Sequence, residues 1–243
     1  MNIIMAHINI ADLTKNFEQE NILSNFNLTI EKGSFLSVLG PSGCGKTTLI
    51  NLIAGFENPS SGIITIDNKK INNESGVIFQ EFSIFPWRNV LENILLGLVD
   101  NKEMTREEKL TTTNKVIGLT SLGGQEKKYP NELSGGMKQK VAIARTIVNN
   151  PKIILMDEPF ASLDSQTKES LQDLILHIWK KQSKTIFFVT HDIGEALYLG
   201  TRIILLNKKG EIVLDEENNN YTNRLDENLI SSEKKIRNII NNF

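Results

Sequence analysis

The chain contains 243 residues, of which 40% are hydrophobic, and its 27 basic and 29 acidic side chains give a formal net charge of -2. This length and apolar content are sufficient for one large domain with a substantial core. The near-neutral balance excludes a chain-wide basic surface of the kind that attracts nucleic acid or an anionic membrane.

The N-terminal region, residues 3–30, predicts an antiparallel β region. Polar and apolar residues alternate around residues 7–13 and 27–31, and a polar stretch separates the two pieces. Phe17 lies in that stretch and has no apolar partner at a regular spacing. Its ring is either a core residue of the β layer or a flat, exposed surface on which a planar ligand can stack.

A glycine-rich turn at residues 40–48 (GPSGCGKTT) joins an apolar run of strand length at residues 35–39 to a helical pattern at residues 49–53. Glycine tolerates backbone angles that are closed to other residues, so successive N–H groups can turn toward one anion. The dipole of the following helix adds to that attraction. The spacing G-x-x-x-x-G-K-T is the P-loop pattern, which cradles phosphates.

We therefore predict that this loop binds a nucleotide; the alternative is a glycine-rich turn that matches the pattern by chance. The ammonium of Lys46 can reach the β- and γ-phosphates, and the hydroxyl of Thr47 can ligate Mg²⁺. Cys44 is the only cysteine, which excludes an internal disulfide and fits a reducing compartment. The residues expected to contact the nucleotide are Gly40, Pro41, Ser42, Gly43, Cys44, Gly45, Lys46, Thr47 and Thr48.

Two further strands and an aromatic segment follow the loop. Residues 62–67 alternate, and residues 76–80 predict a buried strand that ends at Gln80. Apolar and aromatic side chains then crowd around a proline in residues 82–87. This cluster is either local core or a docking surface for a partner helix. Asn89 is expected to cap a helix that begins at the next residue.

Residues 90–149 are predicted to form a smaller helical subdomain inserted between strands of the sheet. Residues 105–119 form a polar helix with a thin apolar stripe. After a break at residues 129–132, the sequence Ser-Gly-Gly at 134–136 precedes a second helix. A serine- and glycine-rich loop before a helix N-terminus is another anion-binding geometry. One P-loop should not need two such sites.

Residues 153–156 form an apolar run of strand length that ends in Asp157 and Glu158. Carboxylates at the C-terminal end of a strand in a parallel sheet would lie beside the P-loop. Because adjacent strand residues point to opposite faces, we expect the two to have different roles. Asp157 can hold Mg²⁺ through water, and Glu158 can accept a proton from the attacking water. The alternative is a solvated acidic turn.

The remaining elements complete the predicted sheet. Asp164 is expected to cap a helix with an apolar stripe over residues 171–178. Residues 185–190 form a buried strand that ends at His191, for which we favour a contact with the γ-phosphate or with water over a structural role. Residues 203–214 predict a hairpin, and residues 236–243 mark an amphipathic terminal helix.

Together these elements predict an α/β fold with a P-loop NTPase core. The core is a mainly parallel sheet flanked by helices, with an antiparallel β layer and an inserted α-helical subdomain. We expect residues 1–243 to form a single ATPase domain. The nucleotide-binding core spans residues 1–89 and 150–215, the helical subdomain spans residues 90–149, and a C-terminal helical tail spans residues 216–243.

The order of these features closely resembles that of the ATP-binding cassette (ABC) ATPases. The motifs that carry the resemblance are GPSGCGKTT, Gln80, LSGGMKQ, IILMDE, ASLD and His191, and they extend across nearly the whole chain. The resemblance implies a homodimer, or a pseudo-dimer with a related ATPase. Each ATP would lie between the P-loop of one subunit and the LSGG loop of the other. That arrangement would explain the two anion-binding loops.

The resemblance also implies roles for individual residues. Phe17 resembles the aromatic residue that stacks on adenine, and Gln80 resembles the residue that links Mg²⁺ and water to the membrane partner. Ser134, Gly135 and Gly136 resemble the γ-phosphate loop that acts in trans. The remaining matches are Asp157 with the Mg²⁺ carboxylate, Glu158 with the general base, Asp164 with the dimer-contact loop and His191 with the switch histidine.

The cofactors expected from this comparison are ATP and Mg²⁺. The predicted catalytic residues are Lys46, Gln80, Glu158 and His191, and the predicted metal site contains Thr47, Gln80 and Asp157. Met137 and Lys140 depart from the common signature, which has glutamine and arginine at these positions. Neither side chain is needed for the backbone cradle, so we expect activity to be retained.

Within the family, the segments VIFQEFSIFPWRNVLENI and LSGGMKQKVAIAR resemble the ATPase subunits of nitrate, sulfonate and taurine importers. The implied function is ATP hydrolysis that drives import through a separate transmembrane permease, with a substrate-binding protein as an indirect partner. Alternatives are the ATPase of an exporter or lipoprotein-release system, or a soluble ABC ATPase without a transport role. The latter typically has two cassettes or a long coiled-coil insertion, and this chain has neither.

The expected location follows from apolar runs and from the N-terminus. The longest apolar runs are far too short to span a bilayer. The N-terminus has no basic segment followed by a cleavage site. We therefore expect a cytoplasmic protein that is peripheral on the inner face of the cell membrane and does not bind nucleic acid.

Overall fold

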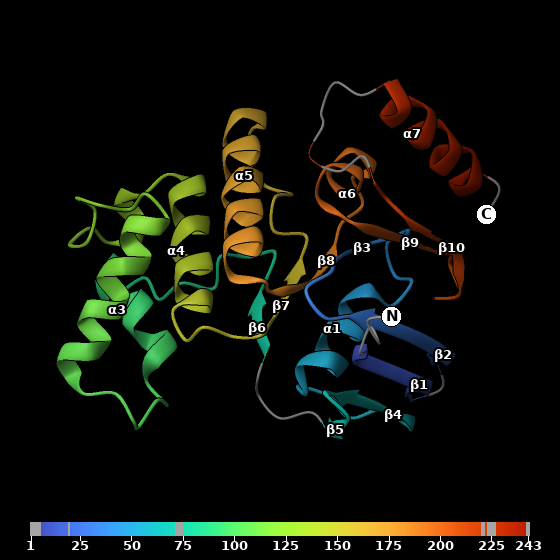
Figure 1. The fold of residues 1–243 in the computed structure, drawn as a ribbon, viewed down its shortest axis with the longest axis horizontal. Helices are drawn as coiled ribbons and strands as arrows, with labels where there is room; N and C mark the ends of the chain where they lie inside the picture. The colour runs from blue at the N-terminus through green and yellow to red at the C-terminus, as the bar shows by residue number, and fades with distance from the viewer. Residues whose placement is uncertain (1–5, 19, 71–74, 220–221, 223–226, 242–243) are drawn as a thin grey trace, which may run out of the picture.

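The chain, described here by a computed structural model, folds into two β-sheets with helices packed against them (Figure 1). The structure describes residues 6–18, 20–70, 75–219, 222 and 227–241. The six-stranded sheet has the order β10-β9-β3-β8-β7-β6, with the bounds Ile212–Glu217, Arg202–Leu206, Phe35–Leu39, Thr185–Val189, Ile153–Asp157 and Ser75–Ile78. Its neighbouring strands are parallel except in the β9–β10 hairpin.

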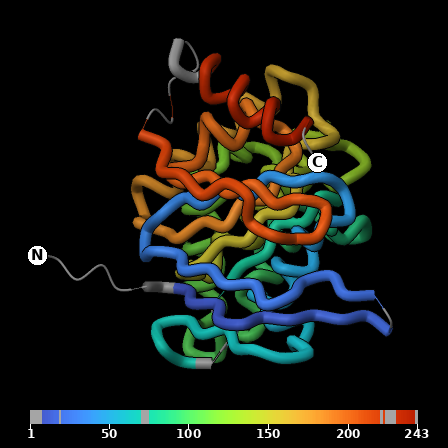
Figure 2. Tube along the Cα trace, turned by 90° about the vertical axis from the view of Figure 1, so that its right-hand side faces the viewer, coloured from blue at the N-terminus to red at the C-terminus, as the bar shows by residue number. Residues whose placement is uncertain are grey.

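The four-stranded sheet is antiparallel, as predicted for the N-terminal region. Its order is β2-β1-β4-β5, with the bounds Glu20–Glu31, Ala6–Phe17, Ser61–Ile66 and Lys69–Lys70. The β1–β2 hairpin crosses the lower part of the molecule in Figure 2. The sheet covers one face of the larger sheet together with α1 (Lys46–Ala54).

The central strands β3, β7 and β8 are buried at every residue. On one face, Met156 and Phe188 pack in a core with α5 (Ser165–Gln182). On the other face, Leu155 and Phe187 pack in a second core with α1 and the smaller sheet. A parallel sheet that is covered on both faces needs apolar residues at successive positions, so these strands are mostly apolar and do not alternate; Ser37, Asp157 and Thr185 are their buried polar residues.

The helices between β6 and β7 form the left-hand part of Figure 1. They are α2 (Val90–Leu95), the 3₁₀ turn Leu96–Leu98, α3 (Arg106–Leu119), the 3₁₀ turn Pro130–Glu132 and α4 (Gly135–Ile147). Asn89 caps α2, as predicted, and Thr105 caps α3. In both caps the carboxylate of a glutamate three residues later accepts a hydrogen bond from the backbone N–H of the cap residue, which fixes where the helix starts.

The N-terminal strands are longer than the alternation indicates. β1 continues to Phe17 and β2 begins at Glu20, so the polar stretch expected between two short strands is the end of one hairpin. The strand pairing shifts between Ile10 and Leu13, where Asp12 has a φ of 50°. Such a bulge interrupts the alternation on which strand recognition depends.

The strand β6 also differs from the prediction. It ends at Ile78 rather than at Gln80, and it forms an edge of the sheet. Ile78 is its only buried residue, so the expectation of a buried strand is wrong. An edge strand lacks a neighbour on one side and is exposed there.

At the C-terminal end, β10 continues to Glu217, two residues past the expected boundary at residue 215. The helices α6 (Ile193–Leu199) and α7 (Glu227–Ile240) pack together through Ile193, Leu197 and Ile236. A terminal helix is therefore present, but it begins at Glu227, well before the predicted range of residues 236–243, and Phe243 lies outside the described residues. In Figure 2, α7 lies at the end of the molecule opposite the β1–β2 hairpin.

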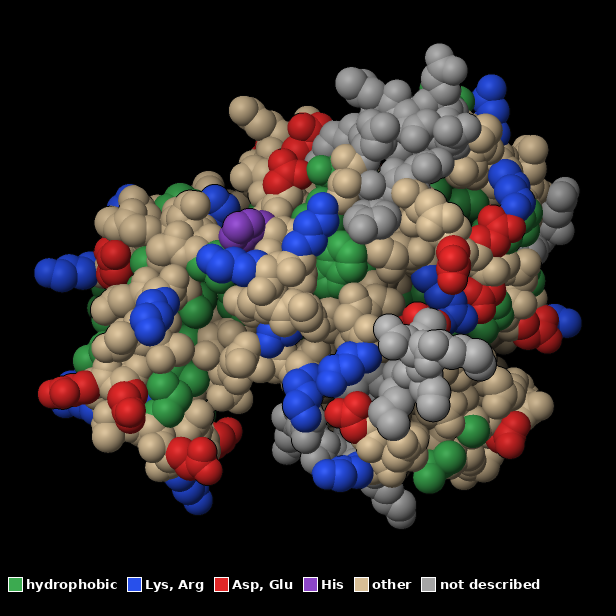
Figure 3. All heavy atoms as spheres, viewed as in Figure 1, with side chains coloured by type: hydrophobic (Ala, Val, Ile, Leu, Met, Phe, Trp, Pro, Cys, Tyr) green, Lys and Arg blue, Asp and Glu red, His purple; other side chains and the backbone are tan. Residues whose placement is uncertain are grey.

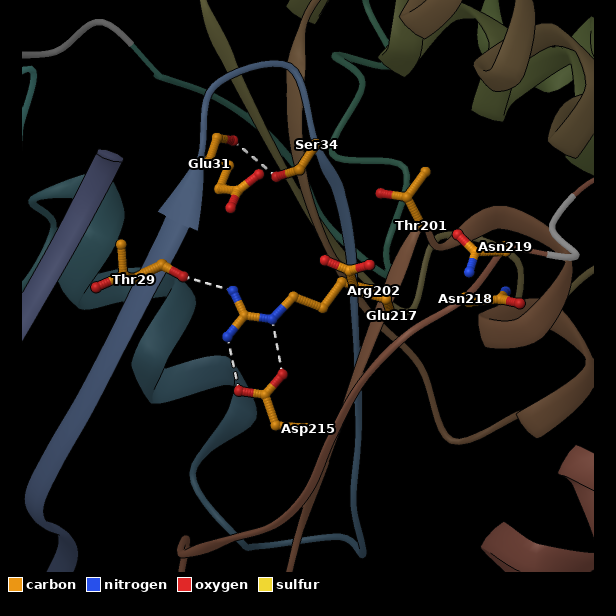
Figure 4. Close-up of a pocket in the computed structure, with 9 residues that line it drawn as sticks. All are labelled: Thr29, Glu31, Ser34, Thr201, Arg202, Asp215, Glu217, Asn218 and Asn219. Atoms are coloured by element: carbon orange, nitrogen blue, oxygen red, sulfur yellow. Dashed lines mark hydrogen bonds and ion pairs between the residues drawn. The ribbon is translucent and has the colours of Figure 1, made fainter. Parts of the chain in front are cut away.

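The two sheets are joined by Arg202 at the start of β9 (Figure 4). Its guanidinium donates to both carboxylate oxygens of Asp215, at 2.7 and 2.6 Å, and to the carbonyl oxygen of Thr29 in β2, at 2.6 Å. A cavity of about 730 Å³ surrounds this bridge. The bidentate pair fixes the orientation of the guanidinium, so Arg202 forms a fixed bridge between the two sheets.

The surface carries charges of both signs. On the face seen in Figure 3, Lys and Arg side chains lie among Asp and Glu side chains, as the near-neutral balance predicts. Within the described ranges, none of the helices combines the length and the apolar content that crossing a bilayer requires.

Candidate functional site

The P-loop has the predicted strand-turn-helix context. β3 ends at Leu39 and α1 begins at Lys46. Gly43 and Gly45 have φ values of 81° and 98°, in the left-handed region that favours glycine. Gly45 is the N-cap of α1, and no side chain caps this helix. The N–H groups of the first helical turn have no acceptor within the helix, so they are available to an anion.

Lys46 is buried at the base of the loop. Its Nζ donates to the carbonyl oxygens of Gly40 and Pro41, at 2.7 and 2.8 Å. The third direction of the ammonium meets the Sγ of Cys44 at 3.9 Å, and a thiol is a weak acceptor. The ammonium thus has two strong acceptors and one weak one, and the weak contact is the one that a phosphate oxygen would replace at the lowest cost.

Cys44 is only 1% exposed, and burial raises the pKa of its thiol. A protonated, buried thiol is unreactive. Cys44 therefore contributes its backbone and its small size to the loop.

Thr47 and Asp157 meet from opposite sides of the loop. Thr47 lies in the first turn of α1, Asp157 ends β7, and the threonine hydroxyl donates to Asp157 Oδ2 at 2.8 Å. Burial raises the pKa of Asp157 and the Glu158 carboxylate raises it further, while the Thr47 hydrogen bond and the Lys46 charge oppose this. A buried carboxylate with a raised pKa is stabilised in its charged form by a cation.

Glu158 and His191 form a second pair at the same edge of the sheet. Glu158 Oε2 lies 2.8 Å from His191 Nδ1. Glu158 has a φ of 43°, and its N–H donates to the carbonyl oxygen of Val189, so the chain turns at this residue instead of continuing β7. Asp157 and Glu158 therefore have different partners, Thr47 and His191, because the chain turns at Glu158 as well as because neighbouring strand residues point to opposite faces.

Lys46, Thr47 and Glu158 line a cavity of about 460 Å³, whereas Asp157 and His191 reach it only through their contacts with Thr47 and Glu158. Its lining residues are Glu20, Ile22, Ser42, Gly43, Gly45, Lys46, Thr47, Thr48 and Glu158. The arrangement fits a nucleoside triphosphate, because the N–H groups at the start of α1, an ammonium and glycines surround this cavity. It also fits Mg²⁺, which is held in such sites by one or two protein oxygens together with phosphates and water.

Glu20 and Ile22 were missed by the sequence analysis. Both come from the start of β2, inside the polar stretch that separates the two predicted strands and outside any motif. Only the pairing of β1 with β2 brings them to the P-loop, and the sequence offers no chemical signal for it.

Phe17 lies at the end of β1 and is 42% exposed, so the alternative of a core residue is wrong. The Nζ of Lys15 lies 4.6 Å from the centroid of its ring, which restricts the ring through a cation–π contact. Gln80 is exposed and follows β6, in which Ile78 pairs with Met156. Gln80 therefore lies two residues beyond the last residue of β6, at the end of the sheet where β7 gives way to Glu158.

The LSGG loop differs from the P-loop. Ser134 is the N-cap of α4, and its hydroxyl accepts from the N–H of Met137 at 3.3 Å. Gly136 is buried, and a Cβ there would lie 2.2 Å from Thr167 Cγ2 in α5. The described residues that line the P-loop cavity do not include Ser134, Gly135 or Gly136.

Asp164 caps α5, as predicted, by accepting from the N–H of Thr167 at 3.0 Å. Hydrogen bonds from Thr167 hold the pKa of Asp164 below its usual value. Thr167 thus lies between the LSGG loop (residues 133–136) and the Asp164 loop (residues 161–164). It packs against Gly136 and donates its N–H to Asp164.

The fold and the site define a nucleotide-binding ATPase of the P-loop class. The profile of the ABC transporter family matches residues 23–161, more than half of the chain, and the chain belongs to that family. It is the ATP-binding subunit of an ABC transporter.

Named relatives agree with this assignment. The aliphatic sulfonates import ATP-binding protein SsuB of Bacillus thuringiensis subsp. konkukian is 42% identical over 220 residues, 87% of this chain and 86% of that protein. The taurine import ATP-binding protein TauB of Yersinia pestis bv. Antiqua is 42% identical over 210 residues, 85% of this chain and 82% of that protein. The solved dimeric structure of MJ0796, a bacterial ABC transporter cassette, has 37% identity and a TM-score of 0.78, covering 86% of this chain and 98% of that chain.

Proposed function

We propose that this chain hydrolyses Mg-ATP and thereby drives import of a sulfonate-type anion through a separate membrane permease. The observation that carries the proposal is the convergence of the P-loop with the Thr47–Asp157 and Glu158–His191 pairs at one edge of the sheet. The family and the import names of two relatives favour this over an exporter or a soluble ATPase.

In the proposed mechanism, the P-loop N–H groups and Lys46 hold the β- and γ-phosphates. Thr47 and Asp157 would hold Mg²⁺, with Gln80 nearby, and the bound ion would neutralise charge on the phosphate oxygens. Glu158 accepts a proton from the attacking water at its carboxylate. His191 positions that carboxylate through its Nδ1, 2.8 Å away. Phe17 supplies the stacking surface for adenine.

We further propose that the active form is a dimer, homomeric or with a related ATPase. The LSGG loop lies outside the P-loop cavity of its own chain, so a second copy would supply Ser134, Gly135 and Gly136 to the γ-phosphate. Asp164 would lie in the contact between the copies. The dimeric relative supports this arrangement.

The permease would dock beside the helices between β6 and β7, which we propose as the helical subdomain at residues 90–149. Trp87 and Val99 are 68% and 64% exposed, and Phe85 lies against Trp87 with ring centroids 5.4 Å apart. A cavity of about 450 Å³ lies next to them, between Phe85, Leu96, Val99 and Arg145. Exposed aromatic side chains beside a cavity are typical anchors for a partner helix.

Location and substrate follow from the permease. An ATPase that is held by permease loops would be peripheral on the cytoplasmic face of the membrane. A separate binding protein and the permease would select the substrate. Aliphatic sulfonates and taurine share a sulfonate group, so the relatives point to this chemical class.

The decisive variant is Glu158→Gln. It should retain Mg-ATP binding, lose turnover by about 100-fold or more, and accumulate as a dimer in Mg-ATP. Phosphate release and light scattering measure the two effects, and the same variant in ADP is the control. Full turnover by this variant would refute the base assignment.

The substrate class is tested in vesicles that contain the permease and this chain. A binding protein loaded with taurine should stimulate ATP hydrolysis, and the same protein loaded with nitrate serves as the comparison. Equal stimulation by both would contradict a sulfonate transporter.

A further inference from the structure

Lys168 connects the first turn of α5 to the loop that carries His191, and neither the motifs nor the proposed mechanism uses it. Its Nζ lies 2.8 Å from Glu195 Oε1 and 3.5 Å from Asp192 Oδ2. Its backbone N–H donates to the carbonyl oxygen of Asp164. One residue thus touches both the Asp164 loop and the residues that follow His191.

The contacts around His191 converge on Glu195. The hydroxyl of Thr190 donates to Glu195 Oε2 at 2.6 Å and accepts from the N–H of Asp192 at 3.1 Å. Asp192 in turn caps α6 by accepting from the N–H of Glu195 at 3.1 Å. Both neighbours of His191 in the chain are therefore fixed through Glu195.

The network is placed where its hydrogen bonds are strong. Thr190 and Glu195 are 2% and 6% exposed, and charge-assisted hydrogen bonds strengthen when water is excluded. Lys168 lies in the first turn of α5, where the helix dipole disfavours a cation. The carboxylates of Glu195 and Asp192 offset that cost, so the lysine position is explained by this contact and not by helix formation.

Resting on the proposed roles of Glu158 and His191, we propose that Lys168 is a positioning residue for hydrolysis. The Lys168–Glu195–Thr190 network holds the backbone of His191 so that its imidazole stays within hydrogen-bond distance of Glu158. Because Lys168 is also bonded to Asp164, a displacement of the Asp164 loop changes the position of His191. The network thereby connects the proposed dimer-contact loop to the proton-accepting carboxylate of the same chain.

The test compares variants of the full chain, in complex with its permease where turnover requires it. Lys168→Met alone leaves the Glu195 carboxylate buried without its partner, which endangers the fold. The double variant Lys168→Met/Glu195→Gln removes both charges and keeps an oxygen acceptor for Thr190. Lys168→Arg keeps the charge, and Lys181→Met, at the exposed last turn of α5, is the matched control.

For the double variant we expect kcat to fall about 10-fold or more while the KM for Mg-ATP changes less than about threefold, because misplacing a catalytic group affects the chemical step. Lys168→Arg, which keeps the positive charge, should retain kcat within about threefold of wild type. Lys181→Met should match wild type. The thermal unfolding midpoint of each variant separates a loss of positioning from a loss of folding.

A double variant with wild-type kcat and an unchanged unfolding midpoint overturns the proposal. A rise in KM equal to the fall in kcat/KM also overturns it, since that pattern means lost binding. Glu158→Gln and His191→Ala, measured beside them, separate the two levels. If both are inactive and the double variant is active, only the role of Lys168 fails; if either turns over normally, the proposed mechanism fails with it.

Discussion

The P-loop and the LSGG loop both place glycines before a helix, yet they treat the helix N-terminus differently. At the P-loop, Gly45 caps α1 in a left-handed conformation and no side chain occupies the free N–H groups. At the LSGG loop, the hydroxyl of Ser134 already accepts one N–H of α4. The first helix end offers its donors within a cavity, whereas the second satisfies part of them within its own chain.

The two loops also use glycine for different reasons. Gly45 needs its positive φ of 98°, whereas Gly136 allows α4 to approach Thr167 of α5 closely. A P-loop glycine thus shapes a binding surface, and the LSGG glycine sets the packing of two helices. The difference teaches that one sequence signature, glycine before a helix, can encode either a ligand site or a helix contact.

The strongest test of this comparison is Lys46→Ala. Among the described residues that line the P-loop cavity, Lys46 alone carries an ammonium, so we expect the affinity for Mg-ATP to fall about 10- to 100-fold, the range for a charge-assisted hydrogen bond. Titration with Mg-ATP at low protein concentration, where dimers do not form, measures this. Lys138→Ala, in the first turn of α4, should change the affinity less than about threefold. Equal losses would mean that the two helix ends are equivalent.

Gly136→Ala tests the packing role. A methyl group there would overlap Thr167 Cγ2, and we expect the free energy of unfolding to fall by about 1–3 kcal/mol. Chemical denaturation measures it. Thr167→Ser removes the opposing methyl and should restore most of the loss in the double variant. Gly118→Ala in α3, where an added Cβ meets nothing within 4 Å, is the control and should not destabilise the chain.

Ser134→Ala sharpens the difference in capping. Loss of the bond to Met137 should cost about 1 kcal/mol of stability, while the affinity of the monomer for Mg-ATP stays unchanged. Denaturation and nucleotide titration of the same sample give both values. If the variant lost nucleotide affinity as a monomer, the LSGG loop would belong to the site of its own chain.

The smallest expected effect is a pH dependence at Asp157. Burial raises its pKa in the folded chain above the ordinary value of 3.8, so the folded form binds its proton more tightly than the unfolded chain. Stability from this group is therefore present at low pH and is lost as the pH rises through the folded pKa. Asp157→Asn should be slightly more stable than wild type at pH 7, measured without nucleotide or metal.

That advantage should shrink as the pH falls, because the wild-type carboxyl becomes neutral as well. Unfolding midpoints of both proteins across the acid range provide the measurement. A difference that grows toward low pH would contradict the assigned direction of the pKa shift. The same variant should bind Mg-ATP less tightly, since a neutral amide is a weaker partner for a cation than a carboxylate.

Much of the fold could be predicted because its central strands and helix starts depend on local signals. The strands β3, β7 and β8 are mostly apolar runs, and Asn89 and Asp164 cap the helices that they were expected to cap. The β1–β2 hairpin could not be delimited, because its bulges break the alternation of side chains. The edge position of β6 depends on sheet order, which is not a local property.

The site shows the same division. The P-loop and the carboxylates at the end of β7 were recognisable because their chemistry requires fixed residue types at fixed spacing. The contact between Lys168 and Glu195 joins two different helices, and the arrival of Glu20 at the P-loop requires strand pairing. Such contacts exist only once the tertiary structure has formed.

The Arg202 bridge between the sheets bears on how the chain would bind a ligand. It anchors β2 at Thr29, while Ile22 and Leu23 of the same strand lie against Gly45, where an added Cβ would be 3.1 Å from each. The β1–β2 hairpin, whose turn follows Phe17, is thus held at two points of β2: at Thr29 by Arg202 and at Ile22 and Leu23 by Gly45. With the proposed role of Phe17, the base would contact one sheet and the phosphates the other at a fixed separation, so little conformational entropy of the protein would be lost on binding.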